Sequence, residues 1–455
     1  MTAANPDLLV GRRPSAIVAV SSGVVATVLG VIGIGRSFGY DEAITYANFI
    51  NGGSVVRALT TQVVFNNHQL FSVVQAIAWR LGVVGESGQR ILPVLYGVST
   101  VAVVAWWVTR RRGMVAGLAA GCFLALQPAF LGEFRSLRGY SLAALAIVVA
   151  ALATHRSWSD DRIRWNVVAG LAMVVAVATH AYSVVALGAL AVGTLVGGRN
   201  RSRQAATWMA AALVTVLVQL PLLGAMRDNS TARGRRFAPR FPVTAAEAHL
   251  GDRWYVAVGF VTLAILGAVT AARSPRGRIA VLAGGMAALS AIVVVWSIVQ
   301  PYDLYPRFFG GLAPALAVLI GFGTAVAPRH LGPVVVLLLA AMVPGAVDAV
   351  RRESPIRAIA SVVELARDSG REVCGSQAEA LEVYTAPVRP VDGVSPSGRD
   401  GYGGCEVFVA VLGLGADARS IAGERFEVRI TAGGATVHSD RAFAVVVEEV
   451  LEPWR

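Results

Sequence analysis

Long apolar runs alternate with short polar segments from the start of the chain to about residue 350. A run of about 20 apolar residues is long enough to cross a bilayer as a helix. Lipid offers backbone groups no hydrogen-bond partner, so we expect each run to be helical. The sequence therefore predicts an all-α polytopic membrane bundle of about eleven transmembrane helices. The runs cover residues 17–35, 91–109, 114–132, 141–154, 165–179, 182–197, 205–226, 254–272, 279–299, 308–327 and 331–349.

The pattern changes after residue 350. Residues 354–368 have the periodicity of an amphipathic helix, with Pro355 near its start. Short strand-like runs follow, separated by turns rich in glycine and proline. We therefore predict a transmembrane domain over residues 1–350 and a small α/β domain over residues 351–455. The strand-like runs are residues 372–374, 405–412, 426–430 and 443–447.

Composition also indicates a membrane protein. The 455 residues are 55% hydrophobic and 15% charged, whereas soluble domains carry about 25% charged residues. The net charge is +12, and arginine supplies all of the Lys and Arg total. The arginines lie in short clusters between apolar runs, which is typical of membrane-protein loops and not of a nucleic-acid-binding surface. Heavy use of arginine, alanine, valine and glycine suggests a GC-rich bacterial source.

The arginine clusters predict an orientation, because short cytoplasmic loops are enriched in positive charge. The clusters fall on alternate loops, which places the N-terminus in the cytoplasm. With about eleven spans the C-terminal domain lies outside, so we expect a multi-pass protein of the bacterial plasma membrane with an extracytoplasmic C-terminal domain. The clusters contain Arg12, Arg13, Arg110, Arg111, Arg112, Arg156, Arg162, Arg164, Arg199, Arg201, Arg203, Arg273, Arg276, Arg278 and Arg329.

Two of the predicted outer loops are unusual. The first, residues 36–90, is long, and its segments 55–64 and 70–81 have the pattern of amphipathic helices at the membrane interface. The fourth, residues 227–253, carries arginines against the positive-inside rule. Either this loop binds an anionic ligand or a neighbouring span is misplaced. Its arginines are Arg227, Arg233, Arg235, Arg236, Arg240 and Arg253.

Two carboxylates follow the first predicted helix at its outer end, in the sequence Tyr40-Asp41-Glu42. Charge at a membrane surface is costly, so it suggests a functional role. A carboxylate there can act as the general base that takes a proton from an attacking hydroxyl. The alternative is an ordinary helix start, with Asp41 as N-cap and Glu42 in the first turn.

Other polar side chains recur at the outer ends of later helices. His68 could bind a phosphate, a metal ion or a sugar hydroxyl, or it could be a plain interface residue. Arg135 and Arg138 share one helix face and suit a phosphate, although with Tyr140 they could equally anchor the helix at the interface. A site at the membrane surface would assemble from such loops. Further candidates are Glu133, His180, Tyr182, Tyr305 and Arg307.

The three cysteines carry little chemistry. Cys122 lies in an apolar run and is expected to be a packing residue. Cys374 and Cys405 share the polar C-terminal region, where they could form a disulfide if that region is exported.

Several short motifs resemble those of the GT-C glycosyltransferases, in the branch of the protein mannosyltransferases and lipid A aminoarabinose transferases. They are the Asp-Glu pair at 41–42, His68 later in the same loop, and the Arg-Gly-Tyr-Ser-Leu sequence at 138–142. The Thr-His-Ala-Tyr sequence at 179–182 and the Tyr-Pro-Arg-Phe-Phe sequence at 305–309 are similar to later motifs of that family.

The resemblance implies transfer of a sugar from a polyprenyl-phosphate donor to a glycan, lipid or protein acceptor, with inversion at the anomeric carbon. It assigns the catalytic base to Asp41, with Glu42 beside it, and the lipid phosphate to Arg138 and Arg307. Cationic groups there would stabilise the charge of the departing phosphate. The residues indicate no particular cofactor, while some family members use a divalent cation (Mg²⁺ or Mn²⁺), a second way to stabilise that charge.

The chain departs from the family pattern at two places. Gln69 follows His68 where the family has proline, and Ser136 stands where many members have an acid. Glu133 lies further back and is a candidate for the missing acid. These departures bear on metal binding and on the class of acceptor.

Two other classes of protein remain as alternatives. A transporter or flippase for a lipid-linked or anionic substrate would carry polar groups near the bilayer midplane, internal repeats and broken helices. The predicted helices are nearly free of internal charge and show no repeat, so outer-face chemistry is favoured. A scaffold that has lost catalysis would leave the Asp-Glu pair and the arginines unexplained.

Overall fold

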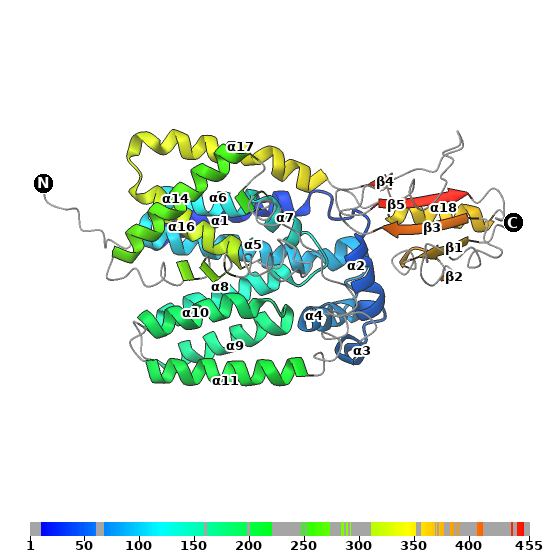
Figure 1. Cartoon of the computed structure of the whole chain (residues 1–455), viewed down its shortest axis with the longest axis horizontal. Helices are drawn as coiled ribbons and strands as arrows, with labels where there is room; N and C mark the ends of the chain where they lie inside the picture. Colours follow the sequence, from blue (N-terminus) through cyan, green and yellow to red (C-terminus); the bar gives the residue numbers. More distant parts are fainter. Residues whose placement is uncertain are drawn as a thin grey trace, which may run out of the picture.

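A computed structural model describes residues 11–60, 68–158, 162–197, 201–220, 253–273, 311–351 and 356–368, with short segments between and beyond them. These residues form a helical bundle (Figure 1). Its long helices are α1 (Arg12–Val31), α5 (Gly85–Arg112), α6 (Met114–Leu126), α7 (Pro128–Phe134), α8 (Tyr140–Ser157), α9 (Ile163–Thr179), α10 (Ser183–Gly197), α11 (Arg201–Gln219), α14 (Trp254–Arg273), α16 (Leu312–Val326) and α17 (Gly332–Arg351).

Five of the described helices are long and apolar enough to cross a membrane, namely α1, α5, α8, α14 and α17. A sixth span arises if α6 and α7, which meet at a 66° bend, are counted together. The helices α9 and α16, and α10 up to Thr194, are apolar but shorter. The prediction of a multi-pass helical membrane protein is confirmed, while the count of eleven stays a prediction. The predicted span 279–299 lies almost entirely outside the described residues.

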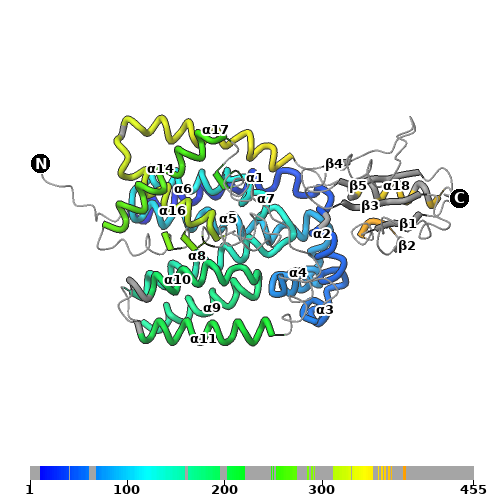
Figure 2. Tube along the Cα trace, viewed as in Figure 1, coloured from blue at the N-terminus to red at the C-terminus, as the bar shows by residue number. Residues whose placement is uncertain are grey.

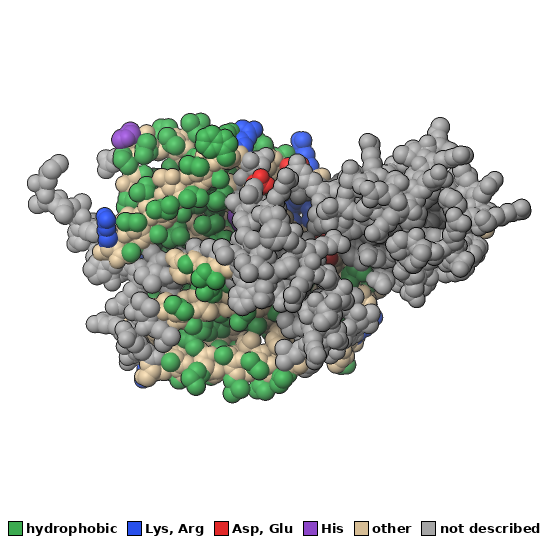
Figure 3. Space-filling view, in the orientation of Figure 1, with side chains coloured by type: hydrophobic (Ala, Val, Ile, Leu, Met, Phe, Trp, Pro, Cys, Tyr) green, Lys and Arg blue, Asp and Glu red, His purple; other side chains and the backbone are tan. Residues whose placement is uncertain are grey.

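The surface of the bundle suits lipid. Exposed valine and leucine side chains include Val20, Leu171, Leu213, Val258 and Leu337. Figure 3 shows hydrophobic side chains spread over the helical part of the molecule, with arginines near its margins. Exposed apolar surface of this extent is unfavourable in water and favourable in a bilayer.

Short helices cover one end of the bundle. They are α2 (Tyr40–Thr45), η1 (Tyr46–Ile50), α3 (Val55–Thr60) and α4 (Gln69–Arg80), and all belong to the predicted first outer loop. Figures 1 and 2 show this loop at the end where α5 begins, α9 and α10 beside α8, and α11 beyond them. The amphipathic helices predicted within 55–64 and 70–81 correspond to α3 and α4.

The other end of the bundle carries many of the predicted cytoplasmic arginines. Arg111 at the end of α5 bonds to His155 at the end of α8, with 2.7 Å between Nη2 and Nε2. The guanidinium of Arg112 lies over the ring of Phe322 on α16, and that of Arg156 over Trp165 on α9. These contacts place the arginines of several loops at one end, as the positive-inside argument requires. Which side of the membrane this end faces stays a prediction.

The described residues beyond the bundle include α18 (Ile356–Asp368), where the sequence predicts a helix over 354–368, and five strands; the α/β domain as a whole stays a prediction. The sheet order is β2-β1-β3-β5-β4, with β1 parallel to β2 and β3, and β5 antiparallel to β3 and β4. The strand predicted at 426–430 lies outside the described residues. The domain boundary at residue 350 stays a prediction. The strands are β1 (Val373–Ser376), β2 (Arg389–Pro390), β3 (Val407–Leu412), β4 (His438–Ser439) and β5 (Ala444–Glu449).

Helices α14 and α16 pack with their backbones in close approach. A Cβ added at Gly323 would lie 1.9 Å from the carbonyl oxygen of Leu263, and one at Gly267 would lie 2.0 Å from the carbonyl oxygen of Leu319. Small residues at such crossings allow the van der Waals packing that holds membrane helices together.

Replacing Gly323 by alanine is expected to push α16 away from α14, because a backbone atom cannot yield as a side chain can. We expect destabilisation of about 1–3 kcal/mol, seen as a lower thermal unfolding midpoint of the detergent-purified protein. The matched control is Gly332→Ala at the start of α17, where a Cβ meets no described atom within 4 Å. Equal midpoints for the two variants would contradict this account of the packing.

Candidate active site

A buried arginine organises the end of the bundle that α2, α3 and α4 cover. Arg90, on the second turn of α5, is 1% exposed. Its Nε and Nη2 donate to the two carboxylate oxygens of Glu42 at 2.9 and 2.7 Å. The same guanidinium donates to the backbone carbonyls of Ile34, Arg36 and Ser37, in the connection between α1 and α2. Arg90 thus ties α5 to both the connection and α2.

Glu42 is enclosed by hydrogen-bond donors. Besides Arg90, it accepts the backbone N–H of Gly39 at 2.7 Å and that of Leu137 at 2.6 Å. Burial opposes ionisation of this carboxyl, but the charge and hydrogen bonds of Arg90, with further help from Arg36 and the Gly39 N–H, lower its pKa to about 2. Glu42 is therefore ionised and fully engaged in holding the loop together.

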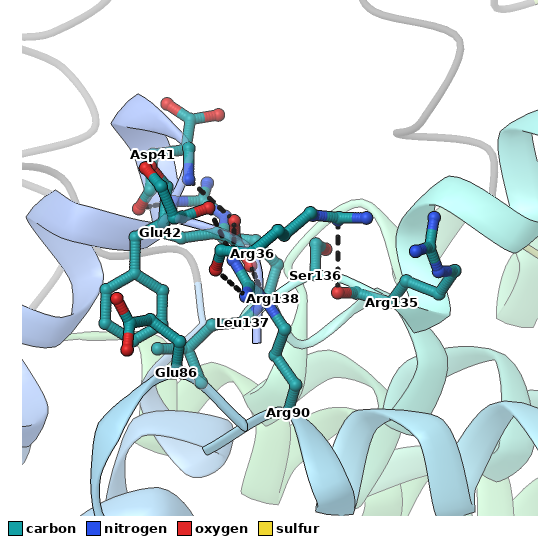
Figure 4. A network of polar contacts seen from close by, with 12 residues as sticks. Arg36, Asp41, Glu42, Glu86, Arg90, Arg135, Ser136, Leu137 and Arg138 are labelled. Atoms are coloured by element: carbon teal, nitrogen blue, oxygen red, sulfur yellow. Dashed lines mark hydrogen bonds and ion pairs between the residues drawn. The ribbon is translucent and has the colours of Figure 1, made fainter. Parts of the chain in front are cut away.

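Asp41 precedes Glu42 in the first turn of α2 and is only partly buried. Its backbone carbonyl accepts from Nη1 of Arg138 at 3.2 Å and from Oγ1 of Thr45 at 2.8 Å. The same Arg138 nitrogen also donates to Oγ1 of Thr45 at 3.1 Å. Figure 4 shows Asp41 beside Glu42, with Arg36, Arg90, Arg135 and Arg138 gathered around them.

Two histidines and two tyrosines cluster next to Arg138. The ring of His68 lies edge-on to Tyr140 at 4.7 Å and stacks on His180 at 5.0 Å. Tyr182 packs on His180 at 5.7 Å, and the Arg138 guanidinium lies 6.0 Å from the Tyr140 ring. Nδ1 of His68 is 3.1 Å from the carbonyl of Thr179 and must carry a proton to donate to it. Three distant segments thus meet at this cluster.

The sequence suggested that Arg135 binds a phosphate, but in the structure its guanidinium bonds backbone carbonyls. It is 1% exposed and donates to the carbonyls of Ala349 and Val350 at the end of α17, and of Ile32 at the end of α1. Burial and the charges of Arg36 and Arg90 lower its pKa to about 9, so it stays charged at neutral pH. Cations stabilise helix C-termini. Arg135 therefore joins two helix ends.

Of the remaining candidates from the sequence, some are described only in part and others lie outside the described residues. Glu133 lies in the last turn of α7, partly buried, and its carbonyl accepts from Ser136. Tyr305, Arg307, the arginines from 227 to 240 and Cys405 lie outside the described residues. Cys374 lies in β1, where its side chain is not described, so the disulfide stays a prediction.

Sequence reasoning missed Arg90 and Arg36, the two arginines of the Glu42 network. Arg90 stands at the start of a long apolar run, where a charge is out of pattern, and this was an available signal for a buried partner of one of the acids. Arg36 donates to the carbonyl of Arg135 at 3.3 Å. Its position directly after α1 gave no comparable signal.

The described residues contain no group of three His, Cys, Asp or Glu side chains that could hold a metal ion. Asp41 lies among arginine donors, and His68 and His180 lie against tyrosine rings. The described donor set does not fit a divalent cation, so no step below is assigned to one.

The fold and the site define a polytopic membrane protein with a carboxylate, an arginine and an imidazole–tyrosine cluster at one end of its helical bundle. No protein-family model and no curated protein sequence matches the chain. The fold, however, is similar to that of solved membrane-protein structures.

The similarity is to solved structures of two proteins, ArnT and AglB. ArnT from Cupriavidus metallidurans, in the apo state, has a TM-score of 0.61 and 16% identity, over 94% of this chain and 97% of ArnT. ArnT bound to undecaprenyl phosphate has a TM-score of 0.56 and 17% identity, over 95% and 98%. AglB, the oligosaccharyltransferase from Archaeoglobus fulgidus in complex with an inhibitory peptide and a dolichol-phosphate, has a TM-score of 0.58 and 12% identity, over 86% and 69%.

Replacing Glu42 by glutamine is expected to leave Arg90 charged and buried without its counter-ion. Breaking a buried ion pair in this way costs about 3–5 kcal/mol. Because folding lowers the pKa of Glu42, the pair stabilises the wild type above pH 4.5, and this contribution is lost as the pH falls toward about 2. Thermal unfolding across this range should show that pH dependence in the wild type and lose it in the variant. An unchanged midpoint at pH 7 would contradict the assignment.

Proposed function

We propose that the protein is a glycosyltransferase that moves a sugar from a polyprenyl-phosphate donor to a glycan, lipid or protein acceptor of the cell envelope. One observation carries this proposal: Asp41, Arg138 and the imidazole–tyrosine cluster meet at one end of a GT-C fold. ArnT binds undecaprenyl phosphate in the same fold, and AglB a dolichol-phosphate. We further propose that this end faces the outside of a bacterial plasma membrane.

Asp41 is the proposed general base. It takes the proton of the acceptor hydroxyl while the hydroxyl oxygen bonds to the anomeric carbon. The bond from that carbon to the phosphate oxygen breaks, and its electron pair leaves with the polyprenyl phosphate. A single displacement of this kind inverts the anomeric centre. Glu42 cannot share the role, because its oxygens accept from Arg90, Gly39 and Leu137.

Arg138 is the proposed ligand of the lipid phosphate, together with Arg307. Among the described residues, the buried Nε of Arg138 has no hydrogen-bond partner, so the guanidinium keeps a donor for an anion. Its Nη1 is anchored to the Asp41 carbonyl and to Thr45. This arrangement supports placing the leaving phosphate close to the base, where a fixed positive charge stabilises the developing negative charge.

The cluster of His68, Tyr140, His180 and Tyr182 is the proposed wall of the sugar pocket. Aromatic faces pack against the apolar face of a sugar ring, while imidazole and hydroxyl groups can bond its hydroxyls. The hydrogen bond from His68 to the Thr179 carbonyl fixes one ring of this wall. Such a wall can distinguish sugars by the orientation of their hydroxyls.

Asp41→Asn is expected to lower transfer at least about a hundredfold, because asparagine keeps the size of the side chain but cannot accept the proton. The measurement is sugar transfer in membranes that contain equal amounts of each variant, with a panel of radiolabelled polyprenyl-phosphate sugars. The matched control is Asp368→Asn at the exposed end of α18, which should transfer like the wild type.

The outcomes of this experiment separate the residue from the class. If wild type transfers and Asp41→Asn matches it, Asp41 is not the base, and Glu133 becomes the next carboxylate to test. If wild type transfers no sugar from a broad panel, the glycosyltransferase proposal fails, and lipid-flipping assays test the transporter alternative.

Arg138→Gln is expected to weaken binding of polyprenyl phosphate at least about tenfold, because charge-assisted hydrogen bonds are worth about 1.5–3 kcal/mol each. Binding of undecaprenyl phosphate to the purified protein measures this directly, without any acceptor. The exposed Arg80 at the end of α4 provides the control Arg80→Gln. Equal affinities for the two variants would remove Arg138 from the phosphate site.

A further inference from the structure

The connection between α1 and α2 (residues 34–38) is held from two sides. From within the bundle, Arg90 donates to the carbonyls of Ile34, Arg36 and Ser37. The carbonyl of Gly35, Oγ of Ser37 and the N–H of Phe38 are bonded by residues that follow the last bundle helix. The connection leads directly into the helix that carries Asp41.

Arg357, on the first turn of α18, makes two of these hydrogen bonds and an ion pair with α5. Its Nη2 donates to the carbonyl of Gly35 at 3.3 Å, and its backbone N–H donates to Oγ of Ser37 at 3.2 Å. The guanidinium also forms an ion pair with Glu86 at the start of α5. Glu86 lies one helical turn before Arg90 on α5. The residue that bonds the connection from within the bundle and the residue that pairs with Arg357 therefore lie on adjacent turns of one helix.

Tyr384 also binds the connection between α1 and α2. Its hydroxyl accepts the backbone N–H of Phe38 at 2.7 Å and hydrogen-bonds to the carboxylate of Glu86. Its ring lies 6.4 Å from that of Phe38, and the Arg357 guanidinium lies over the Tyr384 ring at 5.6 Å from its centroid. Burial raises the pKa of Tyr384 to about 12, so the hydroxyl keeps its proton at physiological pH.

Phe38 connects Tyr384 to the candidate active site through its own contacts. It is 1% exposed, packs on Tyr46 at 5.1 Å and lies under the Arg90 guanidinium at 5.1 Å. The next residue, Gly39, is the N-cap of α2 and donates to Glu42. A six-residue helix is not stable on its own, so its position depends on what holds its start.

We propose that Tyr384 and Arg357 are positioning residues that couple the C-terminal region to Asp41. The predicted effect on kcat rests on the proposed function, whereas the predicted effect on amide exchange does not. The two side chains fix the start of α2 through Phe38, Gly35 and Ser37, and thereby fix where the Asp41 carboxylate stands relative to Arg138. An acceptor that engages the C-terminal region would act on Asp41 through the same contacts.

Tyr384→Phe tests the coupling, because it removes the hydroxyl that accepts from Phe38 and keeps the ring. We expect amide exchange at Phe38 and in the first turn of α2 to become at least about threefold faster, since a net hydrogen bond is worth about 0.5–1.5 kcal/mol. Hydrogen exchange of the full chain in detergent, read by mass spectrometry, measures this without any substrate. Peptides from α8 and α9 should not change.

The catalytic readout is a fall in kcat of about three- to tenfold in Tyr384→Phe, from the loss of one such hydrogen bond, with an unchanged KM for the lipid donor. The matched control is Tyr96→Phe within α5, which removes a hydroxyl away from residues 34–38 and should alter neither exchange nor kcat. A tyrosine with a merely structural role would lower the amount of folded protein and leave kcat per folded molecule unchanged.

The outcomes distinguish the two proposals. Unchanged exchange at Phe38 overturns the coupling, whatever the enzyme does. Faster exchange with unchanged kcat overturns the positioning role, while the glycosyltransferase proposal stands. If the wild type transfers no sugar, the proposed function fails, and the exchange experiment still decides whether Tyr384 holds the start of α2.

Discussion

The buried ion pair between Arg90 and Glu42 is the interaction on which the candidate-site end of the bundle depends. Removing two charges from water is costly, and the mutual attraction repays this only when the remaining donors and acceptors are satisfied. Here they are: Arg90 bonds three backbone carbonyls, and Glu42 accepts two backbone N–H groups. The pair thereby joins α2, α5, the end of α1 and the segment before α8.

This constraint divides the work between two adjacent acids. Glu42 is buried and both of its carboxylate oxygens bond Arg90. Its pKa is lowered to about 2, so it does not take up a proton near neutral pH. Asp41 precedes Glu42 on the same short helix, so the ion pair that holds this helix also fixes the position of Asp41. A general base must be ionised and accurately placed. The pair therefore fixes the position of Asp41, whose carboxylate is the one proposed as the base.

Hydrophobic periodicity was sufficient to predict the helices, because bilayer length and backbone hydrogen bonding leave few alternatives. It also predicted that residues as distant as Asp41, Arg138 and His180 share one end. It could not distinguish Asp41 from Glu42, or Arg138 from Arg135, because each pair has equivalent chemistry and close spacing. Only tertiary partners separate them: Arg90 for Glu42, and the carbonyl ends of α1 and α17 for Arg135. The contact of Tyr384 with Phe38 spans 346 residues and left no local signal.

The same physics explains how a chain with 16% identity to ArnT can share its fold over 94% of its length. Lipid-facing positions need only be apolar, so valine, leucine, isoleucine and alanine exchange there at little cost. Specific residues are needed where backbones approach closely, as at Gly323, and where charge is buried, as at Arg90. The residues that carry the proposed chemistry, in contrast, are concentrated at one end of the bundle. Differences in donor sugar and acceptor should be sought in the side chains around Asp41 and the imidazole–tyrosine cluster, not in the membrane helices.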